Sequence, residues 1–325
     1  MQHRIDKPIG PGRALLRMLL PISGLLLALP AGAVDWDAVE PHEIRLFHPG
    51  QASFEWALDP GSHDPHAVRR FRQDGRNCAQ CHEGEQAELG ESILANEDLE
   101  PHRFDGRPGH IDLDVQATHD GERLYMRFAW NRGGGAGEPM DPDHAARVTS
   151  LFGDNSIREV TRAGCWAACH DDLRGMASDT EDLDLTKYFM GSRTGMARTG
   201  GGEDYRDEAE LEAMLEQGMF AQYWGAEITP DGAAKPRSGY IVEARHGHDD
   251  PDVDVTADRD GDRYVVEVSR PLAGDATRKA LESGGVYHGG FAVHDDHTKG
   301  RFHHISLEYT LSIDSDEGDI AVMKH

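Results

Sequence analysis

Apolar and polar residues alternate with a period of two in the middle of the chain, and this spacing is typical of β-strands. Residues 111–117 place Ile, Leu, Val and Ala at every second position, and residues 124–130 do the same with Leu, Met, Phe and Trp. Asp120 and Gly121 lie between the two runs, and an Asp-Gly pair favours the tight turn of a hairpin. We therefore predict an antiparallel hairpin over residues 111–130.

A similar hairpin is expected nearer the C-terminus. Residues 253–270 resemble residues 113–130, and both segments carry Asp-Gly at the turn. The likeness fits an internal repeat, although two hairpins of the same register would look alike without a common origin. Residues 290–294 and 303–313 have the pattern of a third strand pair. Many short strands with turn signals predict a mainly β protein folded as an antiparallel β-sandwich.

The rest of the chain divides into segments of different composition. Residues 34–108 are polar and poor in helical periodicity, with frequent Pro and Gly, as expected for a small unit held together by a cofactor. Residues 131–240 separate the two hairpins and contain an amphipathic helix at 207–217. We predict a small irregular or helical N-terminal domain over 34–108 and a β-sandwich domain over 109–325, with a helical insertion at 131–240.

The N-terminus, residues 1–33, has the features of a secretory signal peptide. Basic residues precede an apolar run at residues 14–29, and Ala31-Gly32-Ala33 has the A-x-A pattern of a cleavage site. We expect cleavage near Ala33 and export to the periplasm. No later run is long and apolar enough to span a bilayer, so no integral membrane segment is expected after cleavage. An uncleaved anchor is the alternative.

Cys78-Ala79-Gln80-Cys81-His82 has the C-x-x-C-H spacing of covalent c-type haem attachment. Two thiols one helical turn apart can add to the two vinyl groups of one porphyrin, and the histidine that follows can ligate the iron. We predict that Cys78 and Cys81 attach a haem and that His82 is its axial ligand. A disulfide or a Cys/His zinc site would leave the position of His82 unexplained.

Cys165, Cys169 and His170 form a similar group with one extra residue between the cysteines. Positions i and i+4 share a face of a helix, so both thiols can reach one macrocycle, with His170 as axial ligand. The two groups use all four cysteines of the chain. A disulfide between Cys165 and Cys169 is the main alternative. We therefore expect two covalently attached haem c groups, each with its iron.

The sixth ligand of the first haem is expected to be a histidine. No methionine occurs between Met18 and Met126, which disfavours the methionine ligand of small cytochromes. His63 and His66 flank the segment that leads to Cys78, and we place them ahead of other histidines as metal ligands. The other histidines nearby are His42, His48, His102, His110 and His119.

The second haem is expected to take His303 as a ligand. In the strand predicted at 303–313, period two places His303 on the apolar face with Ile305, and His304 on the opposite, solvent face. A buried neutral histidine that ligates nothing is the alternative for His303. His294 is the next candidate. Three methionines that follow the second cysteine pair stay open: Met176, Met190 and Met196.

Short motifs of the strand-rich part resemble the haem-binding subunit of ethylbenzene dehydrogenase, to which the dimethylsulfide dehydrogenase haem subunit is similar. The motifs are residues 119–130, 265–272, 290–293 and the strand around Ser306. The resemblance implies a β-sandwich that binds one haem b through Met and Lys and passes electrons from a molybdenum enzyme. His170 falls near the Met position and His303 near the Lys position. The chain departs from that pattern in Cys165 and Cys169, which imply haem c, and in its N-terminal haem segment.

Charge and haem chemistry together indicate the class of function. The 59 Asp and Glu outnumber the 33 Lys and Arg, for a net charge of −26 at pH 7, which argues against nucleic acid and anionic membranes as partners. We expect electron transfer between redox proteins of a respiratory chain, without catalysis. Expected partners include a molybdenum-containing oxidoreductase or a membrane quinol-oxidising cytochrome. The alternatives are a haem enzyme with one open iron, such as a peroxidase or a small-oxyanion or nitrogen-oxide reductase, and a haem-based sensor.

Overall fold

A computed structural model of the chain describes residues 34–50, 74–97, 99–100, 106–134, 139–166, 189–194, 204–300 and 302–325, with only the backbone of Met190. The described residues from Asp35 to His325 belong to one compact unit. The signal peptide predicted at 1–33 lies outside the described residues. Within the described ranges, no helix has both the length and the apolar character needed to span a membrane.

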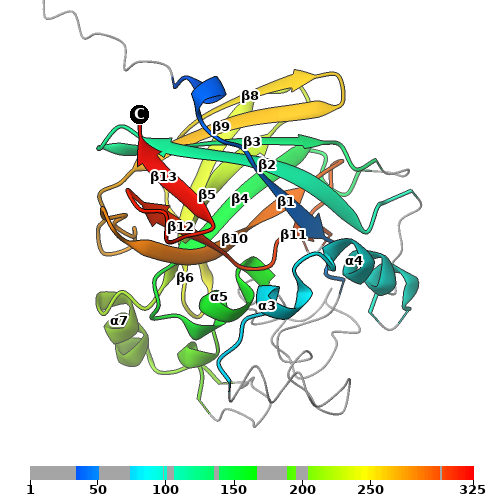
Figure 1. Ribbon diagram of the computed structural model, residues 1–325. Helices are drawn as coiled ribbons and strands as arrows, with labels where there is room; N and C mark the ends of the chain where they lie inside the picture. Colours follow the sequence, from blue (N-terminus) through cyan, green and yellow to red (C-terminus); the bar gives the residue numbers. More distant parts are fainter. Residues whose placement is uncertain are drawn as a thin grey trace, which may run out of the picture. The chain divides into compact units, whose positions relative to one another are not determined.

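The described residues contain thirteen strands in one hydrogen-bonded sheet (Figure 1). The strands are β1 (His42–Phe47), β2 (His110–His119), β3 (Arg123–Asn131), β4 (Ala146–Gly153), β5 (Ala221–Ile228), β6 (Ala234–Ile241), β7 (Arg245–Gly247), β8 (Asp254–Asp260), β9 (Arg263–Pro271), β10 (Val286–His294), β11 (His304–Ile305), β12 (Tyr309–Ile313) and β13 (Ile320–Lys324).

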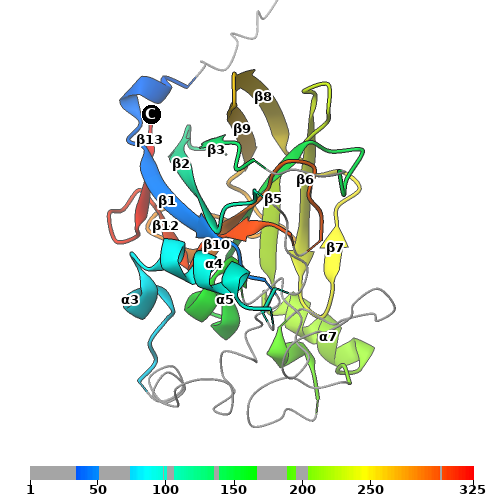
Figure 2. The same cartoon turned by 90° about the vertical axis from the view of Figure 1, so that its right-hand side faces the viewer.

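The sheet folds over into two facing layers. One layer contains β2, β3, β9 and β8, and the other contains β10, β4, β5, β6 and β7 (Figure 2). Short strands connect the layers, β11 and β1 in one place and β12 and β13 in another. All pairs are antiparallel except β12–β13 and β13–β2. The prediction of a mainly β, antiparallel sandwich is confirmed.

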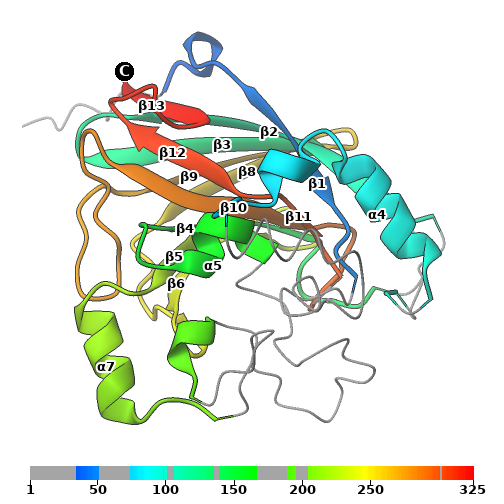
Figure 3. The same cartoon turned by 60° about the horizontal axis from the view of Figure 1, so that its bottom comes forward.

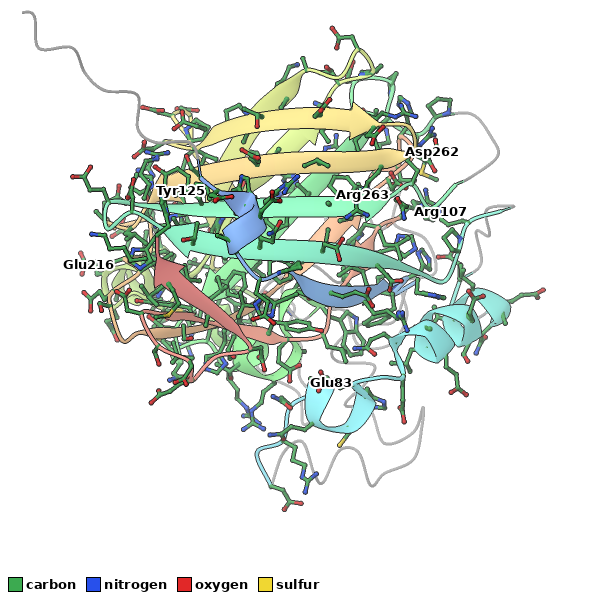
Figure 4. The ribbon with its side chains drawn as sticks, turned by 45° about the horizontal axis from the view of Figure 1, so that its top comes forward. Glu83, Arg107, Tyr125, Glu216, Asp262 and Arg263 are labelled. Atoms are coloured by element: carbon green, nitrogen blue, oxygen red, sulfur yellow. The ribbon has the colours of Figure 1, made fainter. Side chains whose placement is uncertain are left out.

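Side chains from both layers form the main core. Phe128 and Val266 are directly opposite each other on β3 and β9, and both are fully buried. Phe291 on β10 packs edge-on against Phe128, with ring centroids 6.0 Å apart. Tyr125 and Arg263 stand on the layer of β2, β3 and β9, where Figure 4 labels them. The period-two pattern thus places one apolar face of each layer inside the sandwich.

The hairpin predicted over 111–130 is β2–β3. Asp120 accepts backbone N–H bonds from Glu122 and Arg123 and a hydroxyl bond from Tyr125, each at 2.7 Å. Burial raises the pKa of the Asp120 carboxyl, but these hydrogen bonds outweigh it and lower the pKa to about 2. Gly121 takes a φ of +100°, which favours glycine at this position. The Asp-Gly pair therefore specifies the turn through the hydrogen bonds of Asp120 and the positive φ of Gly121.

The hairpin predicted over 253–270 is β8–β9, and it lies directly beside the first one. β9 pairs antiparallel with β3 along its whole length, so the two similar hairpins are neighbours in the sheet. The third predicted pair is β10 with β11 and β12, but the second strand is interrupted at residues 306–308. Residues 34–108 contribute β1 to the same sheet.

The segment 131–240 carries helices and also strands that the sequence pattern did not reveal. Its helices are α5 (Arg158–Ala163), the short helix η2 (Met190–Ser192) and α7 (Glu208–Glu216), and α7 matches the amphipathic helix predicted at 207–217. The segment also supplies β4, β5 and most of β6. In β5 nearly every residue is buried, so no alternation marks it as a strand.

Helices of the N-terminal segment lie next to the strands that close the sandwich. They are η1 (Trp36–Ala38), α3 (Ala79–His82) and α4 (Gln86–Ala95). Figure 3 shows α4 beside β1, and α5 next to β10. Gly90 of α4 touches Gly109, where a Cβ would come within 1.8 Å of the Gly109 carbonyl oxygen. Two glycines thus permit α4 to pack directly against the chain that enters β2.

Candidate haem centre

A second apolar cluster lies on the face of β4, β5 and β10 that is turned away from the main core. Leu151, Tyr223 and Ala292 contribute to it from these three strands. Cys165 is a buried member of the cluster, and Cys78 packs against its edge. The two cysteine motifs, far apart in the sequence, therefore meet on one apolar surface, which we call the outer cluster.

Direct contacts connect the two motifs. The backbone N–H of Cys78 donates to the carbonyl oxygen of Arg162, at the end of α5, over 2.9 Å. The Arg162 guanidinium in turn donates to the carbonyl oxygen of Arg76 over 2.8 Å. Gly164 then ends α5 with a φ of +57°. These bonds hold the start of the first motif against the helix that leads into Cys165.

The first motif forms one turn of helix. The carbonyl oxygen of Cys78 accepts the N–H of Cys81 at 3.1 Å and that of His82 at 2.9 Å. Cys78 is half-buried and Cys81 is exposed, and both are free thiols. Burial and then the nearby Glu308 raise the pKa of the Cys78 thiol. The geometry fits covalent haem attachment, because both thiols are available on one short turn.

Glu308 fixes this turn to the sheet. Both carboxylate oxygens accept the N–H of Ala79, at 3.1 and 3.2 Å. The side chain of Glu308 is buried, and burial raises the pKa of its carboxyl to about 8. The first backbone N–H groups of a helix lack partners within the helix, so this carboxylate supplies one. Figure 4 labels Glu83, the residue that directly follows α3.

His82 has the environment of an axial ligand. Its Nδ1 lies 2.9 Å from Oε2 of Glu85, which can only accept from it when ionised. The hydrogen bond places the ring proton on Nδ1 and leaves the Nε2 lone pair available to a metal. Histidines that ligate metals typically donate their other N–H to a carboxylate in this way. The residues around His82 therefore fit the role predicted for it.

Cys165 lies in the wall of a cavity of about 380 Å³. The exposed fraction of Cys165 is only 1%. His294 and His303 line the same cavity, together with Leu151, Tyr223 and Ala292 of the outer cluster. Cofactor pockets have volumes of roughly 300–1,000 Å³, so the size of the cavity suits a prosthetic group attached at Cys165. Its wall combines apolar side chains at the outer cluster with charged ones, among them Arg147 and Glu227.

His294 and His303 stack on each other in this cavity. Their ring centroids are 4.7 Å apart and the rings are within 15° of parallel. Nε2 of His294 donates to the carbonyl oxygen of Gly300 at 2.9 Å, and its Nδ1 has no hydrogen-bond partner among the described residues. Burial, and then the neighbouring His303, lowers the pKa of His294 well below its usual value. Both candidate ligands thus line the same cavity as Cys165.

The prediction that His304 faces solvent is wrong. The exposed fraction is 1% for His304 and 4% for His303. The two side chains do point to opposite faces, but His304 is covered by the segments around His48 and Pro108. Its Nε2 donates to the carbonyl oxygen of Pro108 at 2.9 Å, and burial lowers its pKa to about 3. The period-two pattern therefore assigned His304 to the correct face of the strand. That face is not exposed to solvent, because the segments around His48 and Pro108 pack over it.

Other histidines considered for the first haem have protein partners. His48 is fully buried, with Nε2 2.7 Å from Oε2 of Glu100. His119 lies 2.8 Å from Asp314. These contacts satisfy one nitrogen of each ring within the protein. Several predicted residues fall outside the described residues: Cys169, His170, His63, His66, His102, Met176 and Met196.

Sequence reasoning missed two residues of the centre. Glu85 follows His82 by three positions, a helical spacing that brings side chains together and could have indicated the pair. Glu308 carried no such signal, because its partner Ala79 lies in a distant part of the sequence. Only the folded chain brings those two residues into contact.

Comparison with known proteins identifies two relatives of nearly full length. The chain is 33% identical over 302 residues to cytochrome c-552 of Stutzerimonas stutzeri, covering 91% of this chain and 93% of that protein. It is 27% identical over 296 residues to cytochrome c-551 of Rhodocyclus tenuis, covering 90% of this chain and all of the relative. No family model matches the chain.

Solved structures offer only a remote likeness. A family 9 carbohydrate-binding module from Caldicellulosiruptor kristjanssonii covers 61% of this chain and 65% of its own, with 9% identity and a TM-score of 0.28. A putative carbohydrate-binding protein from Bacteroides uniformis covers 65% of this chain and 73% of its own, again at 9% and 0.28. Scores this low support no argument about function.

The C-x-x-C-H turn, the outer cluster beside it and the two relatives define a c-type cytochrome, an electron carrier with covalently bound haem c. More specifically, the chain belongs to the family of cytochrome c-552. A carrier of this class exchanges electrons with other redox proteins.

Proposed function

We propose that this protein is a dihaem c-type cytochrome of the periplasm, with two haems close enough to exchange electrons. The observation that carries the proposal is the convergence of the two cysteine motifs. Cys78 and Cys165 belong to one apolar cluster, and the N–H of Cys78 is bonded to Arg162, three residues before Cys165. The bound haem iron supplies the redox chemistry by taking up and releasing one electron.

The chain's own residues have separable roles in this proposal. Cys78 and Cys81 would attach the first haem, with His82, held by Glu85, as a ligand of its iron. Cys165 and Cys169 would attach the second haem, with His170 as a ligand of its iron. His303 would be a further ligand, and His294 is the alternative, since both line the cavity beside Cys165. His63 or His66 is proposed to complete the first haem.

The location and partners are also proposals. The basic, apolar and A-x-A regions of residues 1–33 support export and cleavage near Ala33. The net charge of −26 supports a redox partner with a basic docking face. The resemblance to haem subunits of molybdenum enzymes supports such an oxidoreductase, or a membrane quinol-oxidising cytochrome, as that partner. Residues 34–108 and 109–325 are proposed as the two haem-carrying parts.

Intact mass of the purified holoprotein tests the number of haems. After acid–acetone extraction, the mature chain is expected to retain the mass of two haem groups. A Cys165→Ala, Cys169→Ala double variant should retain one, and a Cys78→Ala, Cys81→Ala variant the other. A wild-type chain with only one haem would refute the dihaem proposal and leave a monohaem cytochrome.

The cavity beside Cys165 favours one second candidate, a haem enzyme with an open iron. Absorption spectra of the ferrous protein with and without carbon monoxide separate the two. Two low-spin haems that do not bind carbon monoxide support electron transfer. A haem that binds it, and that is lost in the Cys165→Ala, Cys169→Ala variant, would support catalysis at that iron.

A further inference from the structure

The cavity beside Cys165 has positively charged walls, although the protein as a whole is strongly acidic, with a net charge of −26. Four cationic side chains from separate elements line it. We call them the cationic groove: Arg147 on β4, Arg237 on β6, Arg245 on β7 and Lys299 after β10. Two carboxylates, Asp141 and Glu227, line the same cavity. The cations thus exceed the carboxylates by two.

The two carboxylates are already engaged by the innermost cations. Arg147 forms ion pairs with Asp141 and, at 3.1 Å, with Glu227. Glu227 also lies 3.9 Å from Arg237. Arg245, by contrast, forms no ion pair with any described residue, and the same holds for Lys299, so the excess charge resides in the outer part of the groove.

The cations lie close enough to act on one another. Burial and then the neighbouring Arg245 lower the pKa of Arg237. Like charges held together at a partly buried site cost free energy unless an anion joins them. The groove is therefore electrostatically incomplete without a ligand that carries negative charge.

The register of the strands shows where the groove lies relative to Cys165. A Cβ at Gly290 would meet the backbone nitrogen of Cys165 at 3.0 Å, so Cys165 is beside Gly290. His294, four residues further along β10, pairs with Arg147 on β4. A strand advances about 3.4 Å per residue, so Cys165 and Arg147 are separated by roughly 14 Å along the cavity floor. A macrocycle attached at Cys165 by its vinyl edge would extend toward the arginines.

We propose that the cationic groove binds the two propionate groups of the haem attached at Cys165. The inference rests on the proposed function, since it needs a haem at that cysteine. Two propionates carry two negative charges, which match the two uncompensated cations. Guanidinium groups bind carboxylates through paired N–H donors, so Arg245 suits a propionate as its ligand, and Lys299 supplies the second positive charge. The groove then fixes which edge of the haem faces each end of the cavity.

The test uses the full-length holoprotein with Arg245→Gln and Lys299→Gln combined. Both side chains are exposed, so folding should be retained. We expect two haem masses as in wild type, a shift of the propionate bending bands in the resonance Raman spectrum, and a lower midpoint potential for one haem. The midpoint potential falls because removal of positive charge favours the oxidised haem. A tenfold change in the oxidised-to-reduced ratio corresponds to 59 mV for a one-electron couple.

Two control variants sharpen the result. Arg259→Gln removes an exposed cation from β8, in the other layer, and should leave the bands and both potentials unchanged. Arg245→Lys, made alone, keeps the positive charge, so the midpoint potentials of both haems should stay close to those of the wild type. Unchanged Raman bands and potentials in the Arg245→Gln, Lys299→Gln variant, with two haems attached, would overturn the inference.

Two other outcomes also count against it. If inorganic phosphate binds the wild-type holoprotein, and the double variant loses that binding without any change in the propionate bands, the groove takes an external anion instead. If the wild-type mass shows no haem at Cys165, the dihaem proposal and this inference fail together, before any groove variant is made. The mass result therefore separates failure of the proposed function from failure of the groove assignment.

Discussion

The carboxylate of Glu308 accepts the backbone N–H of Ala79 through both oxygens, at 3.1 and 3.2 Å. This contact joins the segment before β12, near the C-terminus, to the first turn of α3, the helix that carries the C-x-x-C-H motif. Since Ala79 directly follows Cys78, the bond determines how the first cysteine motif sits on the sheet. A residue without any motif of its own thus positions the motif that defines the protein.

Replacing Glu308 with Ala should destabilise the protein by roughly 1–3 kcal/mol, because the partly buried N–H of Ala79 loses its acceptor. Glu308→Gln keeps an acceptor oxygen and should cost less. Urea unfolding followed by circular dichroism measures both. Equal stability of Glu308→Ala and wild type would mean that water replaces the carboxylate at no cost.

Glu308 should also make stability depend on pH. Burial raises the pKa of its carboxyl from 4.5 to about 8, so between these values the folded state binds more protons than the unfolded state. Stability should therefore be highest below about pH 4.5 as far as this group is concerned, and should fall as pH rises toward 8. Glu308→Gln should flatten the profile between pH 5 and 8. An unchanged slope in that variant would assign the dependence to other groups.

Replacing Glu85 with Gln should raise the midpoint potential of the haem that we propose at Cys78 and Cys81, with His82 as its ligand. The carboxylate 2.9 Å from Nδ1 makes His82 a more basic ligand, which favours the oxidised iron, and an amide does so less. We expect a change of up to about tenfold in the oxidised-to-reduced ratio, or 59 mV, by redox titration. Glu88→Gln, an exposed change on α4, is the matched control and should leave the potential unaltered.

Replacing His303 should change the spin state of a haem, whereas replacing His304 should lower the stability of the protein. His303→Ala should convert one haem from low-spin to high-spin, because this side chain lines the cavity with Cys165. His304→Ala should leave both spin states intact but lower stability by roughly 1–3 kcal/mol, since it breaks a buried hydrogen bond to Pro108. Absorption spectra and urea unfolding distinguish the two effects. A spin change in His304→Ala alone would reverse the assignment, and no spin change in either variant would favour His294.

Gly164→Ala should impair haem attachment at Cys165, the second haem site that we propose. Its φ of +57° disfavours alanine, and a Cβ would come within 2.6 Å of the Gly289 carbonyl oxygen and 2.7 Å of Cα of Glu308. We expect a loss of roughly 1–3 kcal/mol and less haem retained at Cys165 by intact mass. Gly232→Ala is the control, because its φ is also positive, at +88°, but nothing lies within 4 Å. Equal losses of stability in both variants would show that the backbone strain at a positive φ, and not the contact with Gly289 and Glu308, causes the effect.

The sequence alone determined the features that depend on residues close together in the chain. The hairpin β2–β3 followed from alternation and an Asp-Gly turn, because Asp120 bonds its own neighbours. The C-x-x-C-H motif likewise indicated covalent haem c, since its chemistry lies within one helical turn. Strand β5 could not be predicted in this way, because both of its faces are buried and its pattern lacks the polar positions that reveal a strand.

Tertiary structure decided everything that depends on what covers a face or on which distant segments meet. Alternation separated His303 from His304, but only the chain packed around Pro108 and His48 buried His304. The contact of Cys78 with Arg162 and the gathering of the cationic groove from β4, β6, β7 and a loop leave no local trace in the sequence. The spacing of apolar residues reports the secondary structure of one segment. Burial and electrostatic complementarity depend on contacts between segments that are distant in the sequence, and these contacts form only in the folded chain.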